Sequence, residues 1–170
     1  MALFQNKPKN LEEDYLSFPK GKINHTNAES PFGSLILTIT TLGDENDYIF
    51  ISQKSAETFY ENNKDFLENM ENFSCDNYEY FTQILNTFLH INKLGYAKFL
   101  INENQKKIFI NHYESPFAEI FKNKKNQPVC HFLTKFYGII FENLLEKPIK
   151  IKETECGVNN EKCVFEIIID

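Results

Sequence analysis

The stretch PVCHFLTKFYGIIFENLLEKPIKIKETECGVNNEKCVFEI, residues 128–167, decides the fold that the sequence predicts. Its first half places apolar residues at helical spacing between two prolines, Pro128 at the start and Pro148 at the end. Two β-rich runs follow, Ile149–Glu155 and Cys163–Ile169, separated by a loop that contains glycine and asparagine. The pattern predicts one long amphipathic helix and a terminal hairpin.

Four side chains that can ligate a metal lie at the ends of these elements. Cys130 opens the helix, Glu153 and Cys156 end the first strand, and Cys163 starts the second. On a straight strand Glu153 and Cys156 would point to opposite faces, so the four meet only if the chain bulges at residues 154–155. Three thiolates and a carboxylate suit a tetrahedral zinc site without an open coordination position.

Other interpretations of the same side chains stay open at this point. Cys156 and Cys163 can form a hairpin disulfide, Cys130 can be a buried core thiol, and Glu153 can be a surface acid. His131 is a spare ligand candidate, but on a helix it points about 100° away from Cys130. The six-residue gap between the last two cysteines is not a familiar zinc-finger spacing.

The rest of the chain predicts a mixture of strands and helices. A polar arm over residues 1–30 precedes a single domain over residues 31–170. The elements expected upstream of the helix are, in order, a hairpin of Ser34–Thr41 and Tyr48–Ser52, helices at Ser55–Phe73 and Tyr78–Asn92, a hairpin of Tyr96–Ile101 and Lys107–His112, and an irregular stretch over 114–127. This order predicts an α+β fold with an antiparallel sheet packed with helices.

Composition excludes several classes of function. A net charge of -6 argues against binding nucleic acid through its phosphates, and all 18 basic residues are lysines, so bidentate recognition by arginine is absent. No apolar run approaches the ~20 residues of a membrane span. The first residues lack the apolar core of a secretory signal, and four cysteines in such a chain indicate a reducing compartment. We therefore expect a cytoplasmic protein that binds neither nucleic acid nor membrane.

The last third of the chain, residues 108–170, resembles the 4-vinyl-reductase domain family. The family shows a Cys-led amphipathic helix, then Glu-x-x-Cys, a glycine-containing loop and Cys-x-Phe. The matching residues here are Gly138, Leu145, Glu153, Glu155, Cys156, Cys163, Phe165 and the segment NHYESPFA at 111–118.

The resemblance implies a fold of the type shared with haem nitric-oxide sensors and vesicle-tethering subunits, often as a homodimer. In the members that sense aromatic effectors and activate catabolic transcription, three Cys and one Glu hold zinc beside an apolar pocket. Carried over to this chain, those ligands are Cys130, Glu153, Cys156 and Cys163. Cys75 is not among them.

The residues that line the ligand pocket of those sensors match this chain less completely than the metal ligands do. They hold the effector hydroxyl with a His and a Trp, and this chain has no Trp, so phenol itself is not the predicted ligand. The polar candidates are His112, Tyr113 and His90. The aromatic candidates for the wall of the pocket are Phe88, Tyr96, Phe99, Phe109, Phe117, Phe132 and Phe136.

The leading functional hypothesis is a non-catalytic, zinc-stabilised sensory or carrier domain that encloses a small apolar or aromatic ligand. No nucleotide-binding or helix-turn-helix motif is present, so such a domain would signal through a partner protein. One alternative is a tetrapyrrole vinyl reductase or its accessory subunit, although no flavin, dinucleotide or cluster motif accompanies it. Another is a structural interaction module of a larger assembly.

Overall fold

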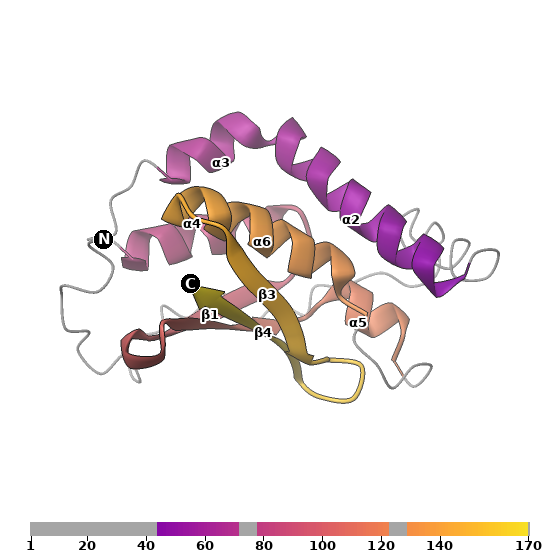
Figure 1. Cartoon of the computed structure of the whole chain (residues 1–170). Helices are drawn as coiled ribbons and strands as arrows, with labels where there is room; N and C mark the ends of the chain where they lie inside the picture. The colour runs from indigo at the N-terminus through magenta and orange to yellow at the C-terminus, as the bar shows by residue number, and fades with distance from the viewer. Residues whose placement is uncertain (1–43, 72–77, 123–128, 170) are drawn as a thin grey trace.

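Helices cover one face of a four-stranded antiparallel sheet in the computed structural model, which describes residues 44–71, 78–122 and 129–169 (Figure 1). In chain order the elements are α2 (Glu45–Asn62), α3 (Lys64–Glu71), α4 (Tyr78–Ile91), β1 (Tyr96–Asn102), the 3-10 turn η3 (Glu103–Gln105), β2 (Lys107–Tyr113), α5 (Pro116–Ile120), α6 (His131–Leu145), β3 (Ile149–Glu155) and β4 (Lys162–Ile169). The predicted α+β class, with helices on an antiparallel sheet, is confirmed.

The sheet is built from two hairpins that meet along their central strands. The strand order is β1-β2-β4-β3, and every neighbouring pair is antiparallel. The end of β2 lies beside the start of β4, where His112 pairs with Cys163. In β3 the register shifts between Glu153 and Glu155, which is the bulge that the position of Glu153 required. Both predicted C-terminal strands and the β1–β2 hairpin are confirmed.

The core lies between the helices and the sheet and is rich in aromatic residues. Helix α6 packs against α2 on one side and against β3 on the other. Phe132 and Phe136 of α6 meet Phe59 of α2, with ring centroids 5.7 and 5.5 Å apart. Such tilted ring pairs add to the free energy of burial because the ring edges meet neighbouring ring faces. Among the described helices, none is both long and apolar enough to cross a membrane.

The strand predicted at Tyr48–Ser52 is wrong, because these residues belong to α2. Asp44 caps this helix, and its side chain and that of Asp47 exchange hydrogen bonds with each other's backbone N–H. Phe50 and Ile51, which made the run look β-like, are 61% and 37% exposed. The side chains that α2 buries are spaced four apart and are Tyr48, Ser52, Ala56 and Tyr60. Two of these four are small or polar, so the helical period was hidden.

Two other predictions needed adjustment, and several fall on residues that the structure does not describe. The helix expected at Ser55–Phe73 is interrupted at Asn63, which ends α2. The stretch over 114–127 contains α5, which Ser115 caps and Pro116 begins. The arm at 1–30, the strand at 34–41, Cys75 and Pro128 lie outside the described residues.

Candidate metal centre

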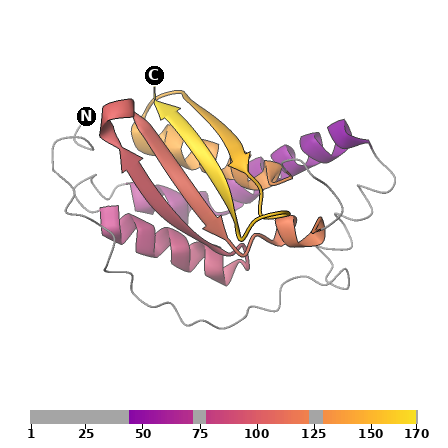
Figure 2. The ribbon, with the colours of Figure 1, turned by 90° about the horizontal axis from the view of Figure 1, so that it is seen from below.

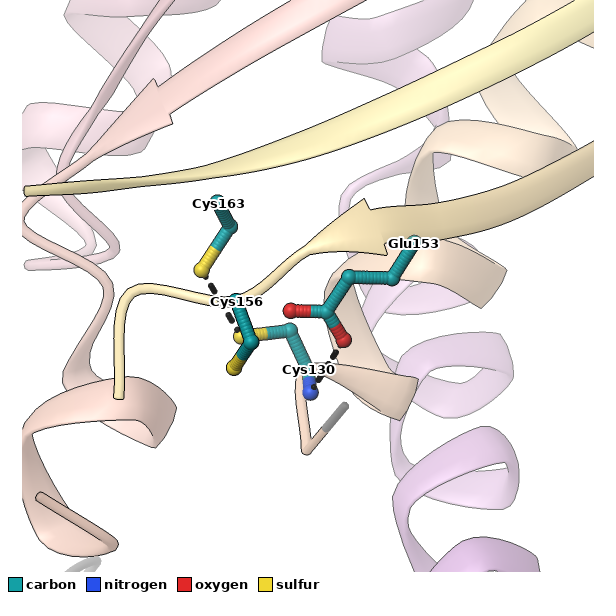
Figure 3. A group of neighbouring side chains, drawn as sticks. All are labelled: Cys130, Glu153, Cys156 and Cys163. Atoms are coloured by element: carbon teal, nitrogen blue, oxygen red, sulfur yellow. Dashed lines mark hydrogen bonds between the residues drawn. The ribbon is translucent and has the colours of Figure 1, made fainter. Parts of the chain in front are cut away.

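Four potential ligands converge where the start of α6 meets the β3–β4 hairpin. One ligand atom from each of Cys130, Glu153, Cys156 and Cys163 lies within 4.8 Å of all the others. Figure 3 shows the three sulfur atoms and the carboxylate turned toward one another. Cys130 and Cys163 have no exposed surface, and Cys156 is 9% exposed. The three thiols are free, so the hairpin disulfide is not formed. Cys130 is therefore brought together with three hairpin residues that lie 23 to 33 positions further along the chain.

Glu153 reaches the cluster because β3 bulges immediately after it. Its Oε2 accepts a hydrogen bond from the backbone N–H of Cys130 at 3.0 Å. That N–H is one of the unpaired donors at the start of α6, where a negative charge is stabilised. Its Oε1 is buried and has no hydrogen-bond partner. A buried carboxylate oxygen without a partner costs about 1–3 kcal/mol or more, unless a cation or proton satisfies it.

Hydrogen-bond donors surround the sulfur atoms. Cys130 Sγ lies 3.2 Å from Cys163 Sγ and 3.2 Å from the hydroxyl of Ser115, the N-cap of α5. The backbone N–H of Gly157 donates to Cys163 Sγ at 3.2 Å. A Cβ on Gly157 would lie 3.3 Å from that sulfur and 3.2 Å from the Cβ of Ala118, so glycine permits this close approach. Such donors stabilise sulfur in its charged form.

A tyrosine from α2 braces the segment that carries the first ligand. The Tyr48 hydroxyl donates to the backbone carbonyl of Val129 at 2.6 Å, immediately before Cys130. The ring of Tyr48 also meets the ring of His131 edge-on, with centroids 5.6 Å apart. His131, the spare ligand candidate, therefore packs on Tyr48 and is not part of the cluster found among the described residues.

Sequence reasoning missed Tyr48 and Ser115 as supporting residues, whereas Gly157 belongs to the glycine-containing loop that the sequence predicted after Cys156. The Ser-Pro pair at residues 115–116 was an available signal for a capped helix start. Tyr48 gave no such signal, because it is brought to Val129 only by the packing of α2 on α6.

The electrostatics of the cluster favour one negative charge and oppose more. Burial raises the pKa of Glu153 to about 8, and burial likewise raises the pKa of Cys130 well above its usual value. For Cys163 the hydrogen bond with Cys130 lowers the pKa, but the bond with Cys156 and burial outweigh it, so the net direction is up. The pKa of Cys156 is lowered because the Cys130 and Cys163 thiols donate to its sulfur. The cluster therefore favours a thiolate at Cys156 and opposes loss of the protons from the other three groups.

The donor set fits a divalent metal of the zinc type. Three sulfurs and one carboxylate oxygen supply four ligands from the chain, and soft thiolates select such ions over magnesium or calcium. The partnerless Oε1 of Glu153 is the acceptor that a bound cation would satisfy. When bound, the ion would join α6 to the terminal hairpin and neutralise the charge of the buried thiolates.

Metal binding to the folded protein at pH 7 is expected to release about three protons. Glu153, Cys130 and Cys163 hold protons there because their pKa values are raised, and each must lose its proton to ligate. Affinity therefore rises with pH. Calorimetric titration with zinc in buffers of different ionisation enthalpy measures the proton count.

Glu153→Gln removes one of these protons, and about two should then be released. Glu155→Gln is the matched control, because Glu155 is exposed and outside the cluster, and about three protons should remain. Equal release from both variants would show that Glu153 is already ionised before metal binds.

The proposed pocket residues fall into two groups in the structure. His112, Phe99, Phe132 and Phe136 are buried between the sheet and the helices. Phe109 and Tyr113 alternate with the buried residues of β2 and therefore point to the opposite face of the sheet. His90 is exposed in the last turn of α4. The structure does not bring these last three side chains to the other four.

His112 is fully buried and both of its ring nitrogens have partners. Nδ1 lies 2.6 Å from the Tyr137 hydroxyl and Nε2 lies 2.7 Å from the carbonyl oxygen of Leu94. The carbonyl only accepts, so Nε2 carries the proton and Nδ1 accepts from Tyr137. Burial lowers the pKa of His112 to about 4, which keeps the ring neutral at pH 7. The polar group expected to meet a ligand hydroxyl is thus already bonded to a hydroxyl of the chain.

Comparisons with known proteins place the fold. No protein-family model matches the chain, and neither does any curated protein sequence. Among solved structures, the phenol-responsive sensory domain of the transcription activator PoxR, in complex with phenol, superposes with a TM-score of 0.61 at 16% identity, covering 80% of this chain and 71% of that one. A trafficking protein particle complex subunit 3 from Naegleria fowleri, covalently bound to palmitic acid, gives 0.55 at 10% identity, covering 82% and 90%.

A vinyl-4-reductase family protein from Methanocaldococcus jannaschii gives a TM-score of 0.44 at 17% identity, covering 85% of this chain and 98% of that one. At these sequence identities, structural similarity shows a shared fold and does not show shared ligands. The chain has the α+β fold of the phenol-responsive sensory domain and of the trafficking-complex subunit.

Proposed function

We propose that the chain is a zinc-stabilised, non-catalytic domain that binds a small apolar or aromatic ligand, as a sensor or a carrier. The proposal of a bound zinc ion rests on the buried Oε1 of Glu153, which has no hydrogen-bond partner and lies against three free thiols. The fold shared with a sensory domain that binds phenol supports the ligand part.

The site argues against catalysis at the metal. Four ligands from the chain complete a tetrahedral shell, whereas catalytic zinc keeps a position for water or substrate. The three cysteines of the cluster are also buried, and the most exposed of them, Cys156, is 9% exposed. This environment supports a structural role for the ion, which would stabilise the fold and take part in no reaction. The geometry of the site gives no support to the vinyl-reductase alternative.

The ligand is proposed to bind in the aromatic layer between α6, α2 and the sheet. Phe132 and Phe136 pack here against Phe117, Phe88 and Phe59, with ring centroids 5.0 to 6.1 Å apart. A guest must separate some of these pairs, and an apolar guest replaces the lost contacts. Tyr137, whose ring centroid lies 6.1 Å from that of Phe136, holds its hydroxyl against the buried His112.

This arrangement predicts a preference for ligands without a hydroxyl group. In the native protein Tyr137 occupies the His112 acceptor, so toluene is expected to bind about tenfold more tightly than p-cresol, whose buried hydroxyl would lack a partner at a cost of about 1–3 kcal/mol. Tyr137→Phe frees the acceptor and should reverse the order. Binding is measured by calorimetry and by the rise in melting temperature with ligand concentration.

Tyr113→Phe is the matched control, because its ring lies on the other face of the sheet and its removal of a hydroxyl should change neither affinity. If neither compound binds at about 1 mM, or if Tyr137→Phe leaves the order unchanged, the proposed ligand layer is wrong.

A homodimer in the cytoplasm, acting through a signalling partner, completes the proposal. The three free thiols of the described residues suit a reducing compartment. The two proteins of similar fold are a sensory domain in complex with phenol and a subunit of a trafficking complex. Their ligands and assembly support a role with a ligand or a partner protein.

A further inference from the structure

The sheet has one face that the described helices leave uncovered. Figure 2 views the molecule from this side, with the strands in front and the helices behind. We call it the open face, and the strand registers define its residues. In rows across β1, β2, β4 and β3 they are Tyr96, Tyr113 and Lys162; Lys98, Asn111, Val164 and Glu155; Leu100, Phe109, Glu166 and Lys152; and Asn102, Lys107, Ile168 and Lys150.

The open face carries the opposite charge to the rest of the protein. Five lysines and two glutamates give it a net charge of +3, whereas the whole chain has -6. One of the two acids, Glu166, is held between Lys107 and Lys152 at 2.6 and 2.9 Å. These bonds lower its pKa, so it stays ionised and its charge is locally neutralised. An acidic partner would therefore be attracted to this face and repelled by the others.

On the open face an apolar pair, Leu100 of the outer strand β1 and Phe109 of β2, has lysines around it. Leu100 is 50% exposed beside the half-buried Phe109, whereas on β4 Val164 is buried and Ile168 is half-buried. Lys150 stands on the outer strand β3. Exposed apolar side chains with a charged rim are common in protein–protein interfaces.

The tyrosines of this face are not arranged to stack nucleic-acid bases. Tyr96 and Tyr113 stack on each other, with centroids 4.9 Å apart, and the ammonium of Lys98 lies 5.5 Å from the centre of the Tyr113 ring. Base recognition on a sheet needs free ring faces and gains from arginine, which the chain lacks. A second copy of the chain would bring the same positive face and be repelled.

The dimensions of the open face suit a single helix. Strands β1 and β2 have seven residues each, about 23 Å of length at ~3.3 Å per residue, and a helix of ~15 residues spans about the same distance. We propose that the open face docks an acidic amphipathic helix of a partner protein, with its apolar stripe on Leu100 and Phe109 and its carboxylates on the lysines of the rim. This inference rests on neither the metal site nor the ligand layer.

The probe for this proposal is a synthetic 15-residue helical peptide with Leu at positions i, i+4, i+7 and i+11 and Glu on its flanks. Titrated into the labelled full chain, it should shift the backbone amide resonances of β1, β2 and β4 with a Kd below about 1 mM. Salt should weaken binding because lysine–carboxylate pairs at a rim are screened. Leu100→Glu should weaken it at least about tenfold, and Lys150→Glu should weaken it to a smaller extent.

Ile91→Glu is the matched control, since Ile91 is 71% exposed on α4, outside the open face, and should leave the affinity unchanged. The proposal is overturned if the peptide fails to bind at about 1 mM, or binds Leu100→Glu equally well. It is also overturned if oligothymidylate or phosphatidylserine vesicles bind the open face and the peptide does not. Zinc content and toluene affinity of the same variants should match wild type, which separates this test from those of the proposed function.

Discussion

Cys163→Ala is expected to abolish stoichiometric zinc binding and most of the stability of the fold. Protein purified under reducing conditions should contain about one zinc per chain, and the variant close to none. Structural zinc sites contribute roughly 10–16 kcal/mol in small metal-binding peptides, while a whole domain is stable by only about 5–15 kcal/mol. Cys163 is fully buried and contacts both the Cys130 sulfur and the Gly157 N–H, so no exposed group can replace it. Elemental analysis and thermal unfolding measure the two losses.

Cys156→Ala should behave in the same way, whereas Cys75→Ala should keep the metal. Cys75 lies outside the described residues, and the four ligands of the cluster are complete without it. The ligand set is wrong if Cys75→Ala loses zinc while Cys130→Ala retains it. Folded wild-type protein that carries no metal would also refute the site.

The elements around the metal cluster could be predicted because their periods are regular. Helix α6 repeats its apolar residues every three or four positions, and β2 alternates buried with half-buried residues. The bulge in β3 could be predicted from a conflict: Glu153 and Cys156 cannot share a face on a straight strand, and the register does shift between Glu153 and Glu155.

The pocket residues could not be selected by residue type alone. Because successive side chains of a strand point to opposite faces of the sheet, His112 cannot share a face with Tyr113, its neighbour, or with Phe109, three positions away. Only one of each such pair can face the helices. The prediction for the residues of α2 was wrong for a different reason. The buried stripe of this helix includes Ser52 and Ala56, and its exposed face carries Phe50. Tertiary packing on α6 decides the burial of that stripe.

Gly95→Ala is expected to destabilise the protein by more than about 4 kcal/mol, an exceptional cost for a single methyl group. Gly95 joins α4 to β1 with φ +96°, a conformation that L side chains rarely adopt. A Cβ there would lie 2.2 Å from the carbonyl oxygen of Tyr113 and 2.8 Å from that of Glu114, and both are backbone atoms at the end of β2. Moving them would disturb the adjacent bond between Leu94 and His112.

Gly138→Ala supplies the matched control for this substitution. In α6 the new Cβ would meet a single side-chain atom, Cγ2 of Ile151, at 3.3 Å, and alanine favours a helix interior over glycine by up to about 1 kcal/mol. The two effects oppose each other, so the melting temperature should change by only a few degrees. For Gly95→Ala it should fall by more than about 8 °C, because 1 kcal/mol corresponds to roughly 2–4 °C in a domain of this size. Melting within about 2 °C of wild type would mean that the α4–β1 turn can relax, and that the His112 pair does not depend on this close backbone contact.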